Sequence, residues 1–146
     1  MNKIFNYSVW TVIVMQALTG IFHTIGLLAD TPPKNDTEKQ LMALMDDYHM
    51  PDGMGFSPTV RSLFFALSAC FSLLCFMGAM LNFYLLRKKV SPGLMKGING
   101  IQAIIFGVCF VLMLFYTFLP PVVCTGLIFA GCLAVFFTAP RDINLK

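Results

Sequence analysis

Charged residues are scarce in this sequence. Only 12% of its 146 residues are Asp, Glu, Lys or Arg, whereas 58% are hydrophobic and the mean hydropathy is +0.77. Soluble domains carry roughly 25% charged residues, so the composition excludes a soluble globular domain. It indicates an integral membrane protein, and the length allows one domain whose core is made by the packed helices.

Four apolar segments are long enough to cross a bilayer, which takes roughly 20 helical residues. They are expected at 9–29, 59–86, 97–118 and 122–139. The sequence therefore predicts an all-α fold, an integral membrane four-helix bundle of up-down-up-down order that forms a single transmembrane domain over residues 1–146. A cleaved signal peptide is the alternative for the first segment, but its apolar stretch exceeds the usual length of about 7–15 residues.

Acidic residues are absent from the interior of all four spans, and six of the seven lie between the first two. Transport along the chain is disfavoured, because a proton or ion relay strings carboxylates or histidines through the membrane. A membrane enzyme acting on a lipid or isoprenoid lacks a carboxylate partner for its acid–base chemistry. The enzyme stays an alternative, and the composition favours a scaffold or accessory membrane protein.

Lysine and arginine gather at the span ends that an even number of crossings places on one side. These residues are Lys3, Arg87, Lys88, Lys89, Lys96, Arg141 and Lys146. Positive residues near short loops stay in the cytoplasm. We therefore expect a multi-pass protein of the bacterial inner membrane with both termini cytoplasmic and the acidic segment 30–58 outside.

Several cofactor and partner motifs are missing. The five cysteines lie in the spans without CxxC spacing, so they are expected to be packing residues. No basic run with interleaved aromatics suggests nucleic acid, which leaves membrane lipids, other membrane proteins or a second copy as partners. Haem is disfavoured because only one of the two histidines lies in a span, whereas haem is usually held by two axial ligands.

The segment between the first two spans is predicted to contain a short amphipathic helix from Thr37 to about His49. Thr37 and Gln40 have the spacing of a capping box. Apolar residues then recur on one helical face: Leu41, Leu44, Met45 and Tyr48. This face is expected to lie against the bundle or in the membrane interface. Downstream, Ser57-Pro58 is expected to begin the second span, and Pro92-Gly93 to form the turn before the third.

Polar residues are rare in the first span, which makes their spacing informative. Gln16, His23 and Asp30 recur every seven residues and form one stripe. Exposing such a stripe to lipid is costly, so His23 should face protein, about 9 Å inside the outer boundary at 1.5 Å per residue. Arg61 enters the second span at the same outer end.

These residues predict an outward-facing polar pocket for a small lipid-like ligand, copper or haem. Its ligand-binding candidates are His23, Arg61, Gln16, Ser62 and Ser68, with Asp46, Asp47 or His49 as a lid. The alternative is structural: His23 locks two helices in register through a hydrogen bond, and Arg61 extends to the headgroups. Both interpretations stay open at this point.

Methionines in the outer segment form a candidate metal site. Met42, Met45 and His49 would share a helical face, with Met50 and Met54 nearby. Thioether and imidazole groups suit copper(I), although methionine is also an ordinary filler of amphipathic faces. The cofactor is therefore unknown, and the metal ligands are a hypothesis.

Two stretches carry a resemblance to known proteins. GIFHTIGLLAD and MGFSPTVRSLFFALSACFSLL, with Met42 and Met45 between them, resemble a family of small uncharacterised bacterial four-helix integral membrane proteins with a G-x-x-H-x-x-G first helix. The likeness covers roughly the first 85 residues. It implies a four-helix fold and marks Gly20, His23 and Gly26, and it implies no activity.

The charge distribution predicts the topology, which cysteine labelling in intact cells can measure. A cysteine at Asn35 should react with an impermeant maleimide added outside, because it lies in the acidic outer segment. A cysteine at Ser91, beside the basic residues, should react only after the cells are opened. Labelling of the Ser91 site from outside would contradict the predicted orientation.

Overall fold

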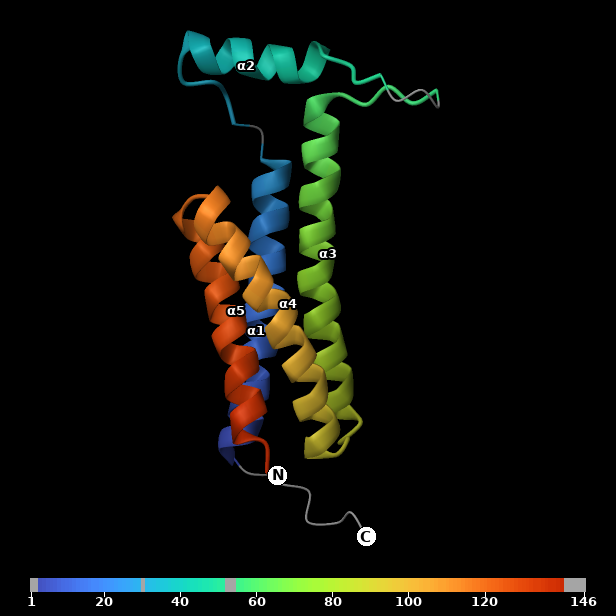
Figure 1. The fold of residues 1–146 in the computed structure, drawn as a ribbon, viewed down its shortest axis with the longest axis vertical. Helices are drawn as coiled ribbons and strands as arrows, with labels where there is room; N and C mark the ends of the chain where they lie inside the picture. The colour runs from blue at the N-terminus through green and yellow to red at the C-terminus, as the bar shows by residue number, and fades with distance from the viewer. Residues whose placement is uncertain (1–2, 30, 52–54, 141–146) are drawn as a thin grey trace. The chain divides into compact units, whose positions relative to one another are not determined.

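The computed structural model describes residues 3–29, 31–51 and 55–140. In these residues it contains five helices and no strand: α1 (Lys3–Leu28), α2 (Asp36–Asp47), α3 (Val60–Arg87), α4 (Pro92–Tyr116) and α5 (Leu119–Thr138). All but α2 are long and apolar enough to cross a membrane. The prediction of an all-α membrane bundle with a short helix between the first two spans is confirmed (Figure 1).

Two helix starts differ from the sequence prediction. Pro92 is the first residue of α4 rather than part of a turn, because the Ser91 side chain caps the helix by accepting a bond from the Leu94 N–H. Lys89, at a φ of 50°, makes the preceding turn. Likewise α3 begins at Val60, since the Thr59 hydroxyl accepts from the N–H of its first turn.

Asn35, and not Thr37, caps α2. The Asn35 side chain accepts a hydrogen bond from the Glu38 N–H at 2.8 Å, while Glu38 reaches back to the Lys34 N–H. The Asn35 amide, two residues before Thr37, therefore takes the N-cap role that the sequence predicts for the Thr37 hydroxyl. The helix itself is confirmed, but it ends at Asp47.

The apolar face of α2 is not buried against protein. Leu41, Leu44 and Tyr48 are each more than half exposed, and no residue of this helix is buried. The prediction that this face lies against the bundle or in the membrane interface stays a prediction.

The chain divides into two compact units, which are described separately. The first comprises residues 1–19 and 75–146, and the second comprises residues 20–74. In the first unit, segments of the four long helices run in alternating directions (Figure 1). The expectation of one continuous transmembrane domain stays a prediction.

Helices α4 and α5 pack through phenylalanine rings set against glycines. A side chain built on Gly107 would meet the Phe129 ring at 3.1 Å, and one on Gly126 would meet Phe110 at 2.9 Å. The two rings are stacked with centroids 6.4 Å apart. Gly100 receives Phe136 in the same way. Glycine thus permits the close approach that helices need in lipid, where the hydrophobic effect does not drive association.

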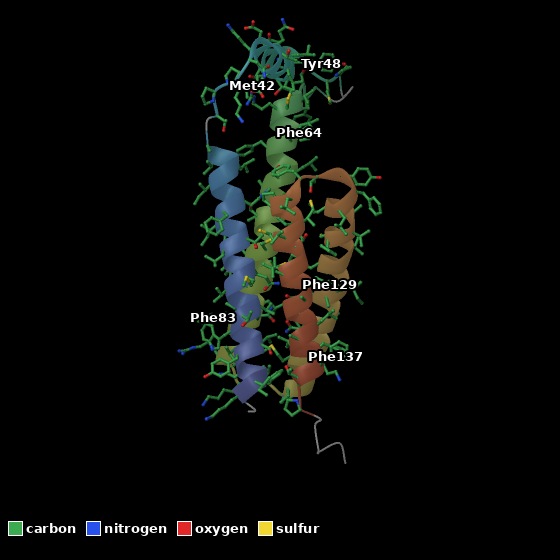
Figure 2. The ribbon with its side chains drawn as sticks, turned by 90° about the vertical axis from the view of Figure 1, so that its left-hand side faces the viewer. Met42, Tyr48, Phe64, Phe83, Phe129 and Phe137 are labelled. Carbon is green, nitrogen blue, oxygen red and sulfur yellow. The ribbon has the colours of Figure 1, made fainter. Side chains whose placement is uncertain are left out.

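Helix α1 completes the first unit against α3 and α5. Val12 lies against Gly131 of α5, where a side chain would meet it at 3.0 Å. Trp10 meets Phe83 of α3 edge-on, with centroids 6.0 Å apart. Side chains of this unit, Phe83, Phe129 and Phe137, are labelled in Figure 2. The inner face of α1 is closed by residues that are almost wholly buried: Phe5, Val9, Val12 and Gln16.

Candidate functional site: a buried amide cluster

Four amide side chains meet inside the first unit. Gln16 comes from α1, Asn82 from α3, and Asn99 and Gln102 from adjacent turns of α4. Three of them are completely buried, and Gln102 is 7% exposed. We call these four residues the amide cluster.

Gln102 is the central acceptor of the amide cluster. Its Oε1 accepts from Gln16 Nε2 at 2.7 Å and from Asn82 Nδ2 at 3.0 Å. Asn82 also donates to Gln16 Oε1 at 3.2 Å, and its own oxygen accepts from Asn99 Nδ2 at 2.9 Å. Asn99 then donates to the Met95 carbonyl at 3.0 Å. The bonds join α1, α3 and α4 to one another.

Gly78 on α3 makes room for this cluster. A side chain at Gly78 would lie 2.5 Å from Gln16 Nε2 and 2.9 Å from its Cδ. Because the Gln16 amide is tied to two other helices, it cannot move away without breaking hydrogen bonds. The glycine is therefore required by the cluster, although it carries no polar group itself.

The amide cluster has no acid or base for catalysis. Amides do not titrate, so they neither accept nor release a proton in the physiological range. The described residues of the first unit, 3–19 and 75–140, contain no Asp or Glu at all. Within the described chain, Asn99 Oδ1 and Gln102 Nε2 lack a hydrogen-bond partner. The arrangement can fix helix register, and it offers one spare acceptor and one spare donor.

His23 and Arg61 belong to the second unit and have different neighbours. The His23 ring meets Phe71 of α3 edge-on, with centroids 5.0 Å apart, and its Nε2 is buried without a hydrogen-bond partner among the described residues. Arg61 pairs with Asp46 of α2, and both side chains are half exposed. The predicted lid residue Asp46 is thus bound to Arg61, while a ligand pocket at His23 stays a prediction.

The remaining candidates are dispersed in the second unit. The Ser62 hydroxyl donates to the Thr59 carbonyl within the first turn of α3, and Ser68 is half-buried on the same helix. Met42 and Met45 are half-buried on α2. His49 lies beyond the end of that helix, and its Nδ1 bonds to the Ser57 carbonyl at 2.7 Å.

A shared helical face for Met42, Met45 and His49 is therefore not formed, because α2 ends before the histidine. No group of three or more His, Cys, Asp or Glu side chains in the described part of the chain could hold a metal ion. Asp30 and Met54 lie outside the described residues. Copper binding stays a hypothesis.

Sequence reasoning missed three members of the amide cluster. The sequence predicts Gln16 in the His23 pocket, whereas in the structure its amide is hydrogen-bonded to Asn82 and Gln102. The sequence does carry a signal for the other three, because each is an amide inside a strongly apolar stretch: Asn82, Asn99 and Gln102. Such groups in a span normally face other helices.

Comparison with known proteins identifies no relative of this chain. No protein-family model, no curated protein and no solved structure matches the chain. The resemblance to small bacterial four-helix membrane proteins stays a prediction.

The hydrogen bonds predict coupling between Gln16 and Gln102. Either residue replaced by leucine should lower the free energy of unfolding in detergent by about 1–2 kcal/mol, because buried donors lose their acceptor. The double variant should lose less unfolding free energy than the sum of the losses in the two single variants, since both partners of the shortest bond are then removed together. Chemical unfolding followed by circular dichroism measures these values.

Thr125→Val is the matched control. Thr125 is also buried, but its hydroxyl donates to the Pro121 carbonyl at 2.7 Å within its own helix. Thr125→Val should therefore lower the free energy of unfolding by less than Gln102→Leu does. Strict additivity of Gln16→Leu and Gln102→Leu would contradict the cluster as an energetic unit.

Proposed function

We propose that this chain is a non-catalytic scaffold or accessory protein of the bacterial inner membrane, with both termini in the cytoplasm. The observation that carries the proposal is the amide cluster. Its amides bond chiefly to one another and cannot titrate, so the interior of the first unit is organised for helix register rather than for proton transfer or hydrolysis.

The exposed surface also supports a role inside the membrane. Helix α4 presents a row of large apolar side chains, including Ile104, Val108 and Phe115, that are 57–79% exposed. Between the first two spans, by contrast, the structure describes only the short helix α2 and its flanking segments. The area available to a protein partner therefore lies mainly on lipid-facing helices.

A scaffold should touch another membrane protein in native membranes. We expect a photo-reactive phenylalanine analogue at Val108 or Phe115 to yield a discrete protein adduct, because these positions face outward from α4. The same probe at Phe106, which is 2% exposed on the same helix, is the matched control and should yield none. Adducts to lipid alone at every outward position along α4 and α5 would overturn the proposal.

A ligand-binding protein is the second candidate, favoured by one observation. His23 Nε2 is buried with no hydrogen-bond partner in the described chain. A buried nitrogen without a partner is costly unless a ligand group meets it. Copper, haem or the polar end of a small lipid-like molecule could supply that group.

Replacement of His23 distinguishes the two interpretations of this residue. If it holds a ligand, His23→Ala should remove a co-purifying molecule or absorption band while membrane insertion and thermal stability stay unchanged. The control Phe71→Leu keeps the histidine and removes only its ring contact, so it should retain the ligand. A variant that loses thermal stability and nothing else would show that His23 is a packing residue.

A further inference from the structure

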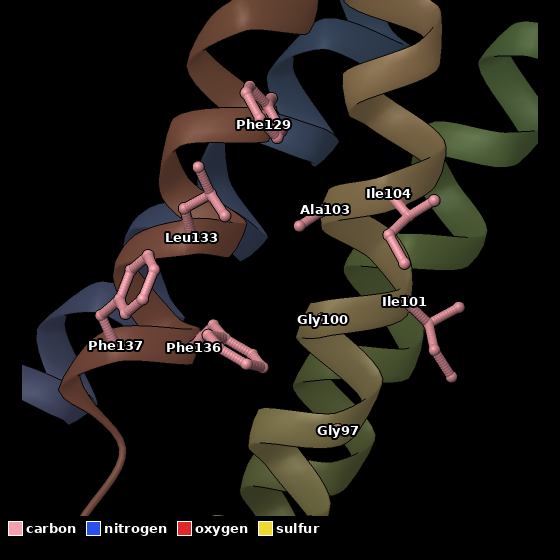
Figure 3. A pocket seen from close by; sticks show the side chains of 9 residues that line it. All are labelled: Gly97, Gly100, Ile101, Ala103, Ile104, Phe129, Leu133, Phe136 and Phe137. Carbon is pink, nitrogen blue, oxygen red and sulfur yellow. The ribbon is translucent and has the colours of Figure 1, made fainter.

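An apolar groove runs along the outside of the first unit between α4 and α5. The open groove has a volume of about 460 Å³. Its floor is formed by Gly97, Gly100 and Ala103 of α4, and its wall by rings of α5. Figure 3 shows Phe136 pointing towards α4 between the levels of Gly97 and Gly100. The groove follows α4 for about 10 Å at the helical rise of 1.5 Å per residue.

The groove exists because the ring-on-glycine packing stops near one end. Phe129 covers Gly107 and Phe136 covers Gly100. The two antiparallel helices therefore keep one register over these seven residues: each step forward along α5 is a step backward along α4. The same register puts Ala139 opposite Gly97, just after α5 has ended at Thr138. No ring therefore covers Gly97, and a side chain built there would meet nothing within 4 Å.

A cation lies beside this end of the groove. Lys96 is half-buried, and its Nζ lies 4.6 Å from the centre of the Phe136 ring that lines the groove. The described residues of the first unit contain five cations and no carboxylate. The other four cations are Lys3, at the start of α1, and Arg87, Lys88 and Lys89, at the end of α3. Lys96 is thus the cation that an anionic group in the groove would meet.

We propose that the groove binds an anionic phospholipid, with one acyl chain against Gly97 and the rings of α5 and the phosphate at Lys96. Apolar walls suit the chain, and basic pockets between helices bind anionic headgroups. This assignment is independent of the scaffold role.

An acyl chain suits the groove better than a helix does. A second helix would have to approach the small residues of α4 closely. Gly100 is already covered by Phe136, whose ring would lie 3.1 Å from a side chain there. Phe137, which is 76% exposed, rises beside it. A thin flexible chain can lie between these rings, whereas a cylinder about 10 Å wide cannot.

Lipid titration followed by native mass spectrometry tests the assignment on the full chain in detergent. Palmitoyl-oleoyl phosphatidylglycerol should bind at least tenfold more tightly than the matching phosphatidylcholine. Gly97→Leu should weaken phosphatidylglycerol binding at least tenfold by filling the groove. Lys96→Gln should weaken it about fivefold, the factor expected for one cation at the membrane surface, and Lys96→Arg should restore it.

Two matched controls separate this site from general effects. Gly26→Leu adds the same side chain to another exposed helical glycine with open space around it. Lys88→Gln removes a cation from the same end. Both should change binding less than twofold. The proposal is overturned if Lys88→Gln matches Lys96→Gln, if Gly97→Leu binds normally, if phosphatidylcholine binds equally, or if Gly97→Leu instead dissociates a dimer with lipid binding unchanged.

Discussion

An amide in hydrocarbon must find a partner inside the protein, since an unpaired polar group there costs several kcal/mol. The amide cluster meets this requirement by drawing on three helices at once. Gln102 serves two donors, one from α1 and one from α3, through a single oxygen. Rotating any of these helices by one residue would send an amide towards lipid. The cluster therefore selects which faces of α1, α3 and α4 meet.

Helix α5 contributes nothing to the amide cluster and is held by different means. Phenylalanine rings of α5 pack against glycines of α4, and Val12 of α1 packs against Gly131 of α5. Thr125, its one completely buried polar residue, bonds within its own helix. Buried hydrogen bonds thus specify the arrangement of three helices, while the fourth is placed mainly by shape complementarity, with one long bond from the Thr138 hydroxyl to Ser8 of α1 at 3.4 Å. Each interhelical bond in a membrane contributes on average about 0.6 kcal/mol, so specificity is the larger effect of the cluster.

The sequence predicts the spans well because the bilayer fixes their length and polarity. Hydropathy averages over all faces of a helix, so it carries no information about which faces meet. For this reason the sequence places Gln16 in a span without showing that its partners are Asn82 and Gln102. The prediction of the α2 cap was wrong for a local reason. Asn35 and Thr37 are both favourable N-cap residues, but it is the Asn35 side chain that accepts a hydrogen bond from the Glu38 N–H.

The lengths of α4 and α5 relate the fold to the membrane surface. Helix α5 has 20 residues, or about 30 Å, which matches the hydrocarbon core, whereas α4 has 25 residues and extends about 8 Å further. Only Thr117 and Phe118 join the two helices, so the excess lies at the other end of α4. In the register set by the rings, the first six residues of α4, Pro92 to Gly97, pass the end of its partner. This overhang leaves Gly97 without a ring from α5, next to Lys96 at the basic end of the helix.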